Sequence, residues 1–342
     1  MIKYPNWAVQ TGGTGPVHGF GIAHDARLSP DFLAGGALVT GDFSGSASFG
    51  STLLTSRGQE DVFVMHVTAA GAIDWAVQAG GASHDLGISI AHDGAGGALV
   101  TGSFSKEASF GSTLLTSRVT ETAFVMHVTE SGVIDWAVQA VGSSYAYGIA
   151  HDSVGGALVA GYFSGKTSFG STPLTSHGEE DAFVMHVTAS GAIDWAVQAV
   201  GSSSSRGIAY DGAGGALVAG YFMGNVLFGS TSLTSRGKED AFVMHVTSSG
   251  AIDWAVQAGG ESTTESNGIA FDGAGGALVT GLFRGKASFG STSLTSRGSV
   301  DTFVMHVTAS GAIDWAVQAG GSSRGIAYDG AGGAFVTGDF RG

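Results

Sequence analysis

The sequence contains no cysteine among its 342 residues. This absence excludes disulfide bonds, zinc sites made of thiolates and a cysteine nucleophile. No window shows apolar residues recurring at the spacing of an amphipathic helix. No apolar run of about 18 residues occurs, and the first residues lack the basic and apolar regions of an export signal. We therefore expect neither long helices nor insertion into a membrane.

Positive charge is scarce as well. The chain has 14 Lys and Arg against 28 Asp and Glu, which gives a formal net charge of −14. A surface that binds the phosphates of nucleic acid or of anionic membranes carries the opposite sign, so we expect neither partner. Hydrophobic residues make up 43% of the chain and charged residues only 12%, which is enough to bury a large core.

What the sequence has in abundance is repetition. Six tryptophans follow one another at spacings of 68, 61, 59, 59 and 61 residues by subtraction: Trp7, Trp75, Trp136, Trp195, Trp254 and Trp315. A fixed period of this length indicates a repeat architecture. We predict a single domain over residues 1–342 with repeats at 11–78, 79–139, 140–198, 199–257 and 258–318, and a last repeat at 319–342 that closes with 1–10.

Each copy carries four short segments that predict β-strands. In the first copy these are strand A (GIAHD, 21–25), strand B (GALVTG, 36–41), strand C (FVMHVT, 63–68) and strand D (IDWAVQ, 73–78). Glycine-rich turns such as DGAGG join A to B, because glycine adopts positive φ at little cost. The SFGSTLLTS segment between B and C predicts a small hairpin of its own. The first copy alone has an insertion after Asp25, seven residues longer than its counterpart.

Four strands per period of about 60 residues are typical of a propeller blade. We expect an all-β protein, a β-propeller of about six four-stranded blades, with the A-to-B and C-to-D turns on one rim and the other loops on the opposite rim. Strands A, B and D occur six times but strand C only five times, so the last blade is incomplete. Three explanations stay open: the hairpin changes the strand count, a second chain completes the blade, or the sequence is a piece of a longer protein, such as a fragment of a seven-bladed propeller.

The ordered run of GIAYD, GALVTG, SFGST, FVMHVT and SGAIDWAVQAGG resembles the SBBP repeats of bacterial seven-bladed β-propeller proteins. The resemblance covers nearly all of the chain from Trp7 to Gly342. It implies one blade per repeat in an exported or surface-associated protein, and it supplies no catalytic residues. One departure concerns strand C, where similar repeats commonly have Lys and this chain has His.

The histidines of strand C are identical in every copy, at positions 66, 127, 186, 245 and 306. Packed sheets lie about 10 Å apart, too far for equivalent side chains to share one metal ion, so we predict histidines packed and hydrogen-bonded between blades. A second position, in strand A, holds His24, His92, His151, Tyr210, Phe271 and Tyr328. Exchange of His with Phe indicates packing there. The recurrent aspartates predict turn acceptors, and we expect no metal, no cofactor and no catalytic constellation.

The segments between strand D and the next strand A differ most among the copies. Loops on a rigid scaffold are where binding groups tend to lie, although neutral drift gives the same pattern. These segments supply the candidate ligand-binding residues His84, Asp85, Tyr145, Tyr147, Arg206, Glu261, Glu265, Asn267 and Arg324.

The sequence therefore predicts a non-catalytic binding or structural module, secreted or at the cell surface, with an undefined protein or glycan ligand. One alternative is a carbohydrate-binding lectin, for which the two tyrosines offer stacking surfaces. A second is an enzyme with its site at the axial end of the channel. A third is a structural protein that self-associates through the incomplete last blade.

Overall fold

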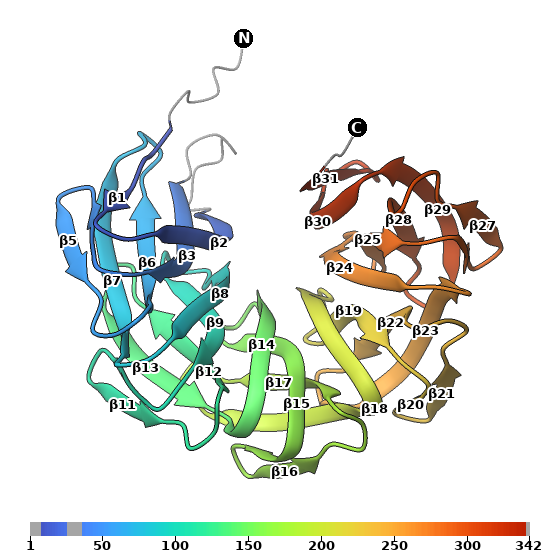
Figure 1. Cartoon of the computed structure of the whole chain (residues 1–342), viewed down its shortest axis with the longest axis horizontal. Coiled ribbons are helices and arrows are strands. Elements are labelled where there is room, and N and C mark those ends of the chain that lie inside the picture. The colour runs from blue at the N-terminus through green and yellow to red at the C-terminus, as the bar shows by residue number, and fades with distance from the viewer. Residues whose placement is uncertain (1–7, 26–35, 340–342) are drawn as a thin grey trace. The chain divides into compact units, whose positions relative to one another are not determined.

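The computed structural model describes residues 8–25 and 36–339, and these contain β-strands and no helix (Figure 1). The prediction of an all-β protein is confirmed. The chain divides into two compact units. Unit 1 comprises residues 1–157, 167–171 and 187–194, and unit 2 comprises residues 158–166, 172–186 and 195–342. Trp7 and most of the predicted insertion after Asp25 lie outside the described residues.

In unit 1, two sets of four strands pair antiparallel in the order A, B, C, D, and the hairpin of the second copy extends the first set into a six-stranded sheet. The first set consists of β2 (Val17–Asp25), β3 (Gly36–Phe43), β6 (Asp61–Val67) and β7 (Ile73–Gly81). The second consists of β8 (Asp85–His92), β9 (Ala98–Phe104), β12 (Thr122–Val128) and β13 (Ile134–Gln139). Strand β14 (Val141–His151), the A strand of the third copy, also lies in unit 1.

The segment between strands B and C forms the predicted small hairpin. In unit 1 the hairpins are β4 (Ser46–Phe49) with β5 (Thr52–Thr55) and β10 (Glu107–Phe110) with β11 (Thr113–Thr116). Each hairpin also pairs with the end of a preceding strand D: β10 pairs with β7 at Gly80 and Gly81. The short strand β1 (Gly12–Gly13) pairs with β4 in the same way. The hairpins therefore fasten consecutive copies to one another.

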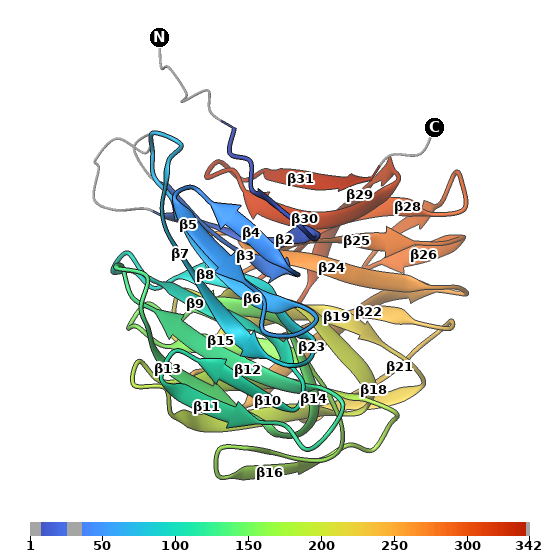
Figure 2. The same ribbon diagram turned by 60° about the vertical axis from the view of Figure 1, so that its left-hand side comes forward.

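Unit 2 repeats this arrangement (Figure 2). One sheet contains β18 (Ile193–Tyr210), β19 (Ala216–Phe222), β22 (Asp240–Val246) and β23 (Ile252–Gly260). The next contains β24 (Thr264–Phe271), β25 (Ala277–Phe283), β28 (Asp301–Val307) and β29 (Ile313–Gly320). The last contains only β30 (Ser322–Tyr328) and β31 (Ala334–Asp339).

The remaining strands are hairpins and strands of the third copy. The hairpins of unit 2 are β20 (Asn225–Phe228) with β21 (Thr231–Thr234) and β26 (Lys286–Phe289) with β27 (Thr292–Thr295). The third copy adds β15 (Ala157–Phe169), β16 (Thr172–Thr175) and β17 (Asp181–Val187). Strand β18 has 18 residues because strand D of the third copy continues without a loop into strand A of the fourth.

The core of each unit lies between consecutive sheets. In unit 1, Val64 of the first sheet packs with Val100 and Phe124 of the second. In unit 2, Val243 packs with Phe303 of the following sheet in the same way. Strand alternation explains this arrangement, since every second residue of a strand faces the neighbouring sheet. Burial of each such side chain contributes about 1.5–3 kcal/mol.

A phenylalanine from each hairpin joins the core on the face that packs against the preceding copy. Phe110 of β10 lies 4.7 Å from Phe124 of β12 and 5.7 Å from Phe104 of β9, measured between ring centroids. The trio recurs as Phe49 with Phe43 and Phe63, Phe228 with Phe222 and Phe242, and Phe289 with Phe283 and Phe303. The hairpin therefore folds against its own sheet because its phenylalanine needs a buried place.

Candidate functional site

The two ends of each sheet differ in character. We call the end with the A-to-B and C-to-D turns the turn end, and the opposite end, where strand A begins, the bulge end. At the turn end of the second sheet, His127 Nε2 lies 2.9 Å from Asp93 Oδ2, and His127 Nδ1 lies 2.7 Å from Asp135 Oδ1. The imidazole stacks on Trp136, its cross-strand neighbour, with 5.7 Å between the ring centroids.

This triad recurs at the turn end of other sheets. Its further members are His66 with Asp25 and Asp74, His245 with Asp211 and Asp253, and His306 with Asp272 and Asp314. The prediction that these histidines are hydrogen-bonded is confirmed, but the partners of His66, His127, His245 and His306 belong to the same sheet and not to a neighbouring one. The reason is the register, which places each histidine opposite the tryptophan that follows the second aspartate.

The triad around His127 favours a charged imidazole. Burial alone lowers the pKa of His127, but the hydrogen bonds to Asp93 and Asp135 outweigh it, so that the pKa is raised. Burial opposes ionisation of Asp93, but the hydrogen bond from His127 and those from two backbone amides lower the pKa of Asp93 to about 2. Both ring nitrogens are occupied by carboxylates, so the imidazole has none left to ligate a metal. Within the described ranges, no three His, Asp or Glu side chains are placed to hold one ion.

The aspartate that ends strand A has a second role as a turn acceptor. Asp93 Oδ1 accepts hydrogen bonds from the amides of Ala95, at 2.7 Å, and Gly97, at 2.8 Å. The same pair of bonds forms at Asp152, Asp211, Asp272 and Asp329. The prediction that these aspartates accept backbone N–H groups is confirmed, and it explains why Asp and Gly recur together at this turn.

The aromatic or His position of strand A packs on the preceding copy. A Cβ at Gly94 would lie 2.9 Å from the ring of His151, and a Cβ at Gly212 would lie 3.0 Å from the ring of Phe271. His92 Nε2 lies 3.2 Å from Asp25 Oδ1. These contacts confirm packing, because the ring covers a turn whose glycine leaves room for it.

The bulge end is built around one irregularity in strand A. In β8, Gly87 pairs with Gly102 and Ser89 pairs with Thr101, so that Ile88 has no partner of its own. The same register shift occurs in β2, β18, β24 and β30. A bulge of this kind turns one side chain out of the pleat. The residues at this position are Phe20, Ile88, Arg206, Asn267 and Arg324, and Tyr147 holds it by sequence in the third copy.

Most candidate binding residues therefore lie in strands, and their prediction as loop residues was wrong. Tyr147, Arg206, Asn267 and Arg324 occupy the bulge position, within β14, β18, β24 and β30. Tyr145 and Glu265 lie two residues earlier in the same strands, β14 and β24. Strand A begins several residues before the GIAHD motif because the polar residues ahead of it pair with strand B. Polar composition had suggested a loop.

Three candidates lie outside this pattern. His84 precedes β8 and pairs with Glu60. Asp85 is completely buried and accepts hydrogen bonds from the amides of Gly81, at 2.7 Å, and Ser105, at 3.3 Å, so its carboxylate faces the interior and not a ligand. Burial raises the pKa of Asp85 to about 6. Glu261 is exposed in the turn between β23 and β24.

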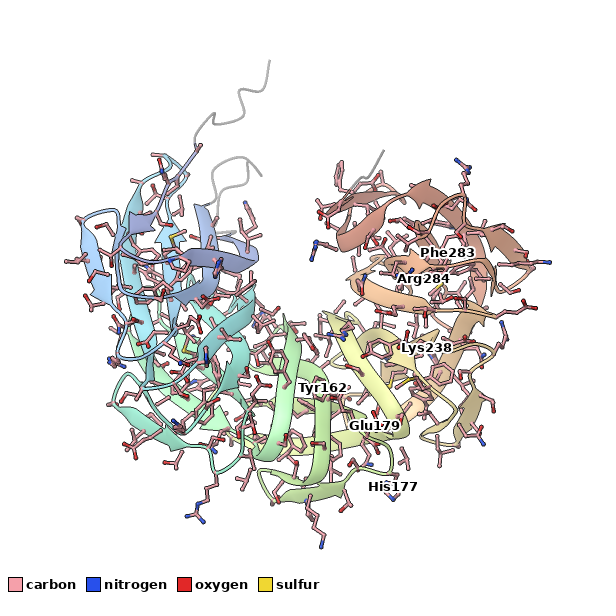
Figure 3. All side chains as sticks on the ribbon, in the orientation of Figure 1. Tyr162, His177, Glu179, Lys238, Phe283 and Arg284 are labelled. Carbon is pink, nitrogen blue, oxygen red and sulfur yellow. The ribbon has the colours of Figure 1, made fainter. Side chains whose placement is uncertain are left out.

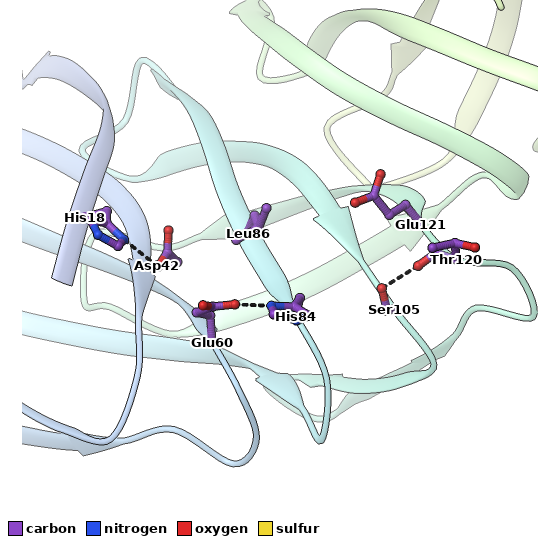
Figure 4. Close-up of a pocket in the computed structure, with 8 residues that line it drawn as sticks. All are labelled: His18, Asp42, Glu60, His84, Leu86, Ser105, Thr120 and Glu121. Atoms are coloured by element: carbon purple, nitrogen blue, oxygen red, sulfur yellow. Dashed lines mark hydrogen bonds and ion pairs between the residues drawn. The ribbon is translucent and has the colours of Figure 1, made fainter. Parts of the chain in front are cut away.

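A cavity of about 300 Å³ opens at the bulge end of unit 1 (Figure 4). Two His–carboxylate pairs line it: His18 Nδ1 lies 3.1 Å from Asp42 Oδ2, and His84 Nδ1 contacts Glu60 Oε2. The other lining residues are Leu86, Ser105, Thr120 and Glu121. Ser105 donates its hydroxyl proton to the carbonyl of Thr120. The cavity is therefore polar, with three carboxylates and two imidazoles.

The electrostatics of this cavity favour a cationic or hydroxylated ligand. Asp42 is 2% exposed, and burial raises its pKa against the opposing effect of His18. Glu60 and Glu121 occupy the same position of consecutive copies, ahead of β6 and β12. Carboxylates accept hydrogen bonds from hydroxyl and ammonium groups and offer nothing to an anion.

Unit 2 has a smaller cavity, of about 170 Å³, at the bulge end of its first sheet. Glu179, Glu180 and Tyr221 line it together with Ser202, Ser203, Ser204 and Met223. Arg206, at the bulge, donates from Nη2 to Tyr221 Oη at 3.1 Å and lies over the ring, 5.2 Å from its centroid. Burial raises the pKa of Glu180 against the opposing charge of Arg206. Figure 3 shows Glu179 on the loop that leads into β17.

Several residues of these cavities were not predicted. His18 lies in one of the most variable segments but was not among the candidates, whereas Asp42, Glu60 and Glu121 lie outside those segments. An alignment of the five copies that contain this segment carries a signal for the glutamate: four copies have Glu, at Glu60, Glu121, Glu180 and Glu239, and one has Val300. A polar residue that is constant outside a turn motif points to a surface position with a role.

Comparisons with known proteins add little. No protein-family model matches the chain. No curated protein matches it either. One similar solved structure is titled "Crystal structure of a protein of unknown function from Bacteroides caccae at 1.35 A resolution". Its sequence is 14% identical, the match covers 75% of this chain and 90% of that one, and the TM-score is 0.37.

Proposed function

We propose that this protein is a β-propeller of about six blades that binds a ligand at the bulge ends of its sheets and does not catalyse a reaction. Three features support the propeller: the order A, B, C, D recurs from sheet to sheet, consecutive sheets pack face to face within each unit, and hairpins fasten strand D of one copy to the next. The resemblance to SBBP repeats supports the same fold and a location outside the cytoplasm. A seven-bladed propeller of which this chain is a part stays the alternative.

The repeated bulge carries the proposal of binding. Each bulge is kept in register by constant glycines and cross-strand pairs, while the residue that it turns out changes from Phe to Ile, Tyr, Arg and Asn. The exposed Thr residues that end the hairpins are constant by contrast, although the exposed position two residues earlier varies from Leu to Pro and Ser. Variation at a turned-out position on a fixed scaffold is typical of a recognition surface.

The polar contacts of the unit 1 cavity support binding without catalysis. Both imidazoles are paired with carboxylates through Nδ1. Ser105 and Thr120 bond to each other and form no hydrogen bond with either histidine among the described residues. A hydroxyl nucleophile needs such a contact with its base.

A lectin is a second candidate, favoured by one observation. Tyr145 and Tyr147 of β14 are half-buried, and their ring centroids lie 4.7 Å apart. An aromatic pair offers a stacking surface to a sugar.

The test is binding to arrays of glycans and of basic peptides. One variant changes the bulge residues Phe20, Ile88, Tyr147, Arg206, Asn267 and Arg324 to Ser, and a matched variant changes the exposed hairpin residues Leu53 and Leu114 to Ser. We expect the bulge variant to lose at least tenfold in affinity for the ligands retained by wild type, and the hairpin variant to keep it. Equal binding by the two variants would contradict the proposal.

A further inference from the structure

The last sheet exposes side chains that every other copy buries. At one position of strand B, Leu38, Leu99, Leu158, Leu217 and Leu278 are 0–1% exposed, whereas Phe335 at the matching position of β31 is 70% exposed. The next residue repeats the contrast, since Val279 is completely buried and Val336 is 39% exposed. The register with strand A is the same in both sheets. The difference therefore lies in what covers strand B.

What is missing beside β31 is strand C. In the preceding sheet, β25 pairs with β24 on one edge and with β28 on the other, over all seven residues. Strand β31 pairs with β30 and with no other strand of the described residues. Its second edge therefore presents unpaired backbone N–H and C=O groups, as an edge strand does, and such an edge accepts an extended strand.

Two polar side chains of the last sheet occupy positions that form hydrogen bonds with strand C in the preceding sheet. In the preceding sheet, Asp272 Oδ2 binds His306 Nε2 at 2.9 Å, and Thr280 donates its hydroxyl proton to the carbonyl of Phe303. The equivalent residues are Asp329 and Thr337. Asp329 Oδ1 accepts the two turn amides as elsewhere, but within residues 8–25 and 36–339 its Oδ2 and the hydroxyl of Thr337 have no hydrogen-bond partner.

A hollow in unit 2 lies where a hairpin pairs in other copies. Strand β23 ends on the hairpin strand β26, with Gly259 opposite Ser288 and Gly260 opposite Ala287. Strand β29 has no such partner in the part of the chain that is described. Beside its end is a cavity of about 750 Å³, whose lining includes Gly320, Gly321, Arg297 and Asp339.

We propose that this face binds a segment of the repeat's own type, a hairpin followed by a strand C, that lies outside these 342 residues. A second copy of the chain is a poor donor. Each chain has five strands C, and every one of them already lies between a strand B and a strand D. They are β6, β12, β17, β22 and β28. A copy that gave one away would open the same gap in itself.

The register of the complex follows from the preceding sheet. Leu278 lies opposite His306, Val279 opposite Met305 and Gly281 opposite Phe303. By the same alignment, Phe335 lies opposite the histidine of the incoming strand, Val336 opposite its methionine and Gly338 opposite its phenylalanine. The histidine then reaches Asp329 Oδ2, and the hairpin enters the cavity beside β29. The pairing is antiparallel, and its specificity rests on the histidine and the phenylalanine.

The experiment adds a synthetic peptide of residues 285–307, which contains β26, β27 and β28, to the full chain. We expect saturable 1:1 binding in calorimetry and slower amide hydrogen exchange in residues 334–339. The peptide with His306→Ala should bind about tenfold more weakly to the wild-type protein. The protein variant Asp329→Ala should weaken binding of the unmodified peptide by a similar factor and should not discriminate between the two peptides.

Three results would overturn the proposal. The first is no saturable binding while circular dichroism shows the protein folded. The second is binding that leaves exchange in residues 334–339 unchanged, which would mean that the peptide occupies another edge. The third is a dimer of the protein alone that protects residues 334–339, because a second copy would then be the occupant. A peptide of the same composition in scrambled order controls for non-specific association.

Discussion

The turn end and the bulge end of one sheet are made by the same four strands, yet they differ in how much each side chain is constrained. At the turn end, one aspartate forms hydrogen bonds with two backbone amides and a histidine. The histidine also forms a hydrogen bond with a second aspartate and stacks on a tryptophan. At the bulge end, one position per copy has no cross-strand partner, and it is occupied by Phe, Arg or Asn in different copies. The fold concentrates its constraints at one end and thereby leaves the other free to vary.

The largest effect is expected when the turn-end aspartate is removed. Asp211→Ala deprives the amides of Ala213 and Gly215 and the ring of His245 of their shared acceptor. Unsatisfied donors of this kind cost about 1–3 kcal/mol each where they are buried, so we expect a loss of about 3 kcal/mol in unfolding free energy. Urea denaturation at pH 6 measures it. Asp211→Asn, which keeps an acceptor, is the control, and a loss below about 0.5 kcal/mol for Asp211→Ala would contradict the contrast between the ends.

Asp85 lies at the bulge end but is completely buried. It therefore gives the bulge end a dependence of stability on pH that can be compared with that of the turn end. Its pKa is about 6 in the folded state against 3.8 for the ordinary group, so the folded protein binds the extra proton between these values. Stability therefore falls as pH rises through this window, by up to about 3 kcal/mol. Asp85→Ser, which places there the residue found at Ser144 and Ser203, removes this dependence.

The measurement is the unfolding free energy of wild type and Asp85→Ser from pH 4 to pH 7. The difference between the two proteins should shift in favour of the variant across this range. A difference that is constant with pH would show that Asp85 has its ordinary pKa. Asp85→Asn serves as a second variant that keeps the size of the side chain.

The histidine triads give the turn end a pH dependence with defined limits. The pKa of His306 is raised, because its hydrogen bonds to Asp272 and Asp314 outweigh burial. Its contribution to stability is complete below about pH 6.5 and is lost as pH rises through the raised pKa. The lowered pKa values of Asp93, Asp211 and Asp272 act at the other limit, since their contribution is lost as pH falls through those values, about 2 for Asp93.

His306→Gln tests this dependence, because Gln keeps hydrogen-bonding groups but carries no charge. We expect the variant to be less stable than wild type by about 1–2 kcal/mol at pH 5.5 and by less at pH 8.5. Thermal unfolding followed by circular dichroism at the two pH values measures the change. An equal loss at both values would mean that the pKa of His306 is the same in the folded and the unfolded protein.

The smallest effect on stability is expected at the bulge. Arg206→Ala removes one hydrogen bond to Tyr221 and the packing of the guanidinium over its ring. We expect a loss below about 1 kcal/mol, because the bulge is held by the backbone pairs around it and not by this side chain. Urea denaturation at pH 7 measures it. A loss as large as that of Asp211→Ala would remove the distinction between the two ends.

The sequence allowed the strands to be predicted because their signals are local. Alternation in FVMHV and the glycines of DGAGG depend on neighbours a few residues away, and β6 and the turn after Asp93 agree with the prediction. The hairpin was predicted from SFGSTLLTS for the same reason. Its pairing with the preceding strand D joins residues such as Gly81 and Ala108, and no local pattern reports such a contact.

The site was harder to predict because its positions depend on register. Polar residues such as Ser203 and Thr264 suggested loops, yet they pair with strand B and are buried between sheets. The outer members of the His127 triad, Asp93 and Asp135, are 42 positions apart in the sequence by subtraction. Its members were each noted as constant, but a bond between them depends on strand pairing. The cavity in unit 1 contains His18 and Asp42, a pair found in one copy only, which repetition cannot reveal.

The way strand D ends on the hairpin of the following copy, as β7 does on β10, has a consequence for how such a gene can change length. Trp195 and Trp254 are 59 residues apart by subtraction, and the residues on either side of the joint are nearly the same in each copy. After loss or duplication of one full period, the glycine pair that ends a strand D again meets a hairpin of the same type. The pairing between strand D and the hairpin then forms as before. Recombination between copies then yields proteins with more or fewer sheets that all fold locally alike, and the turned-out residue of each copy travels with it.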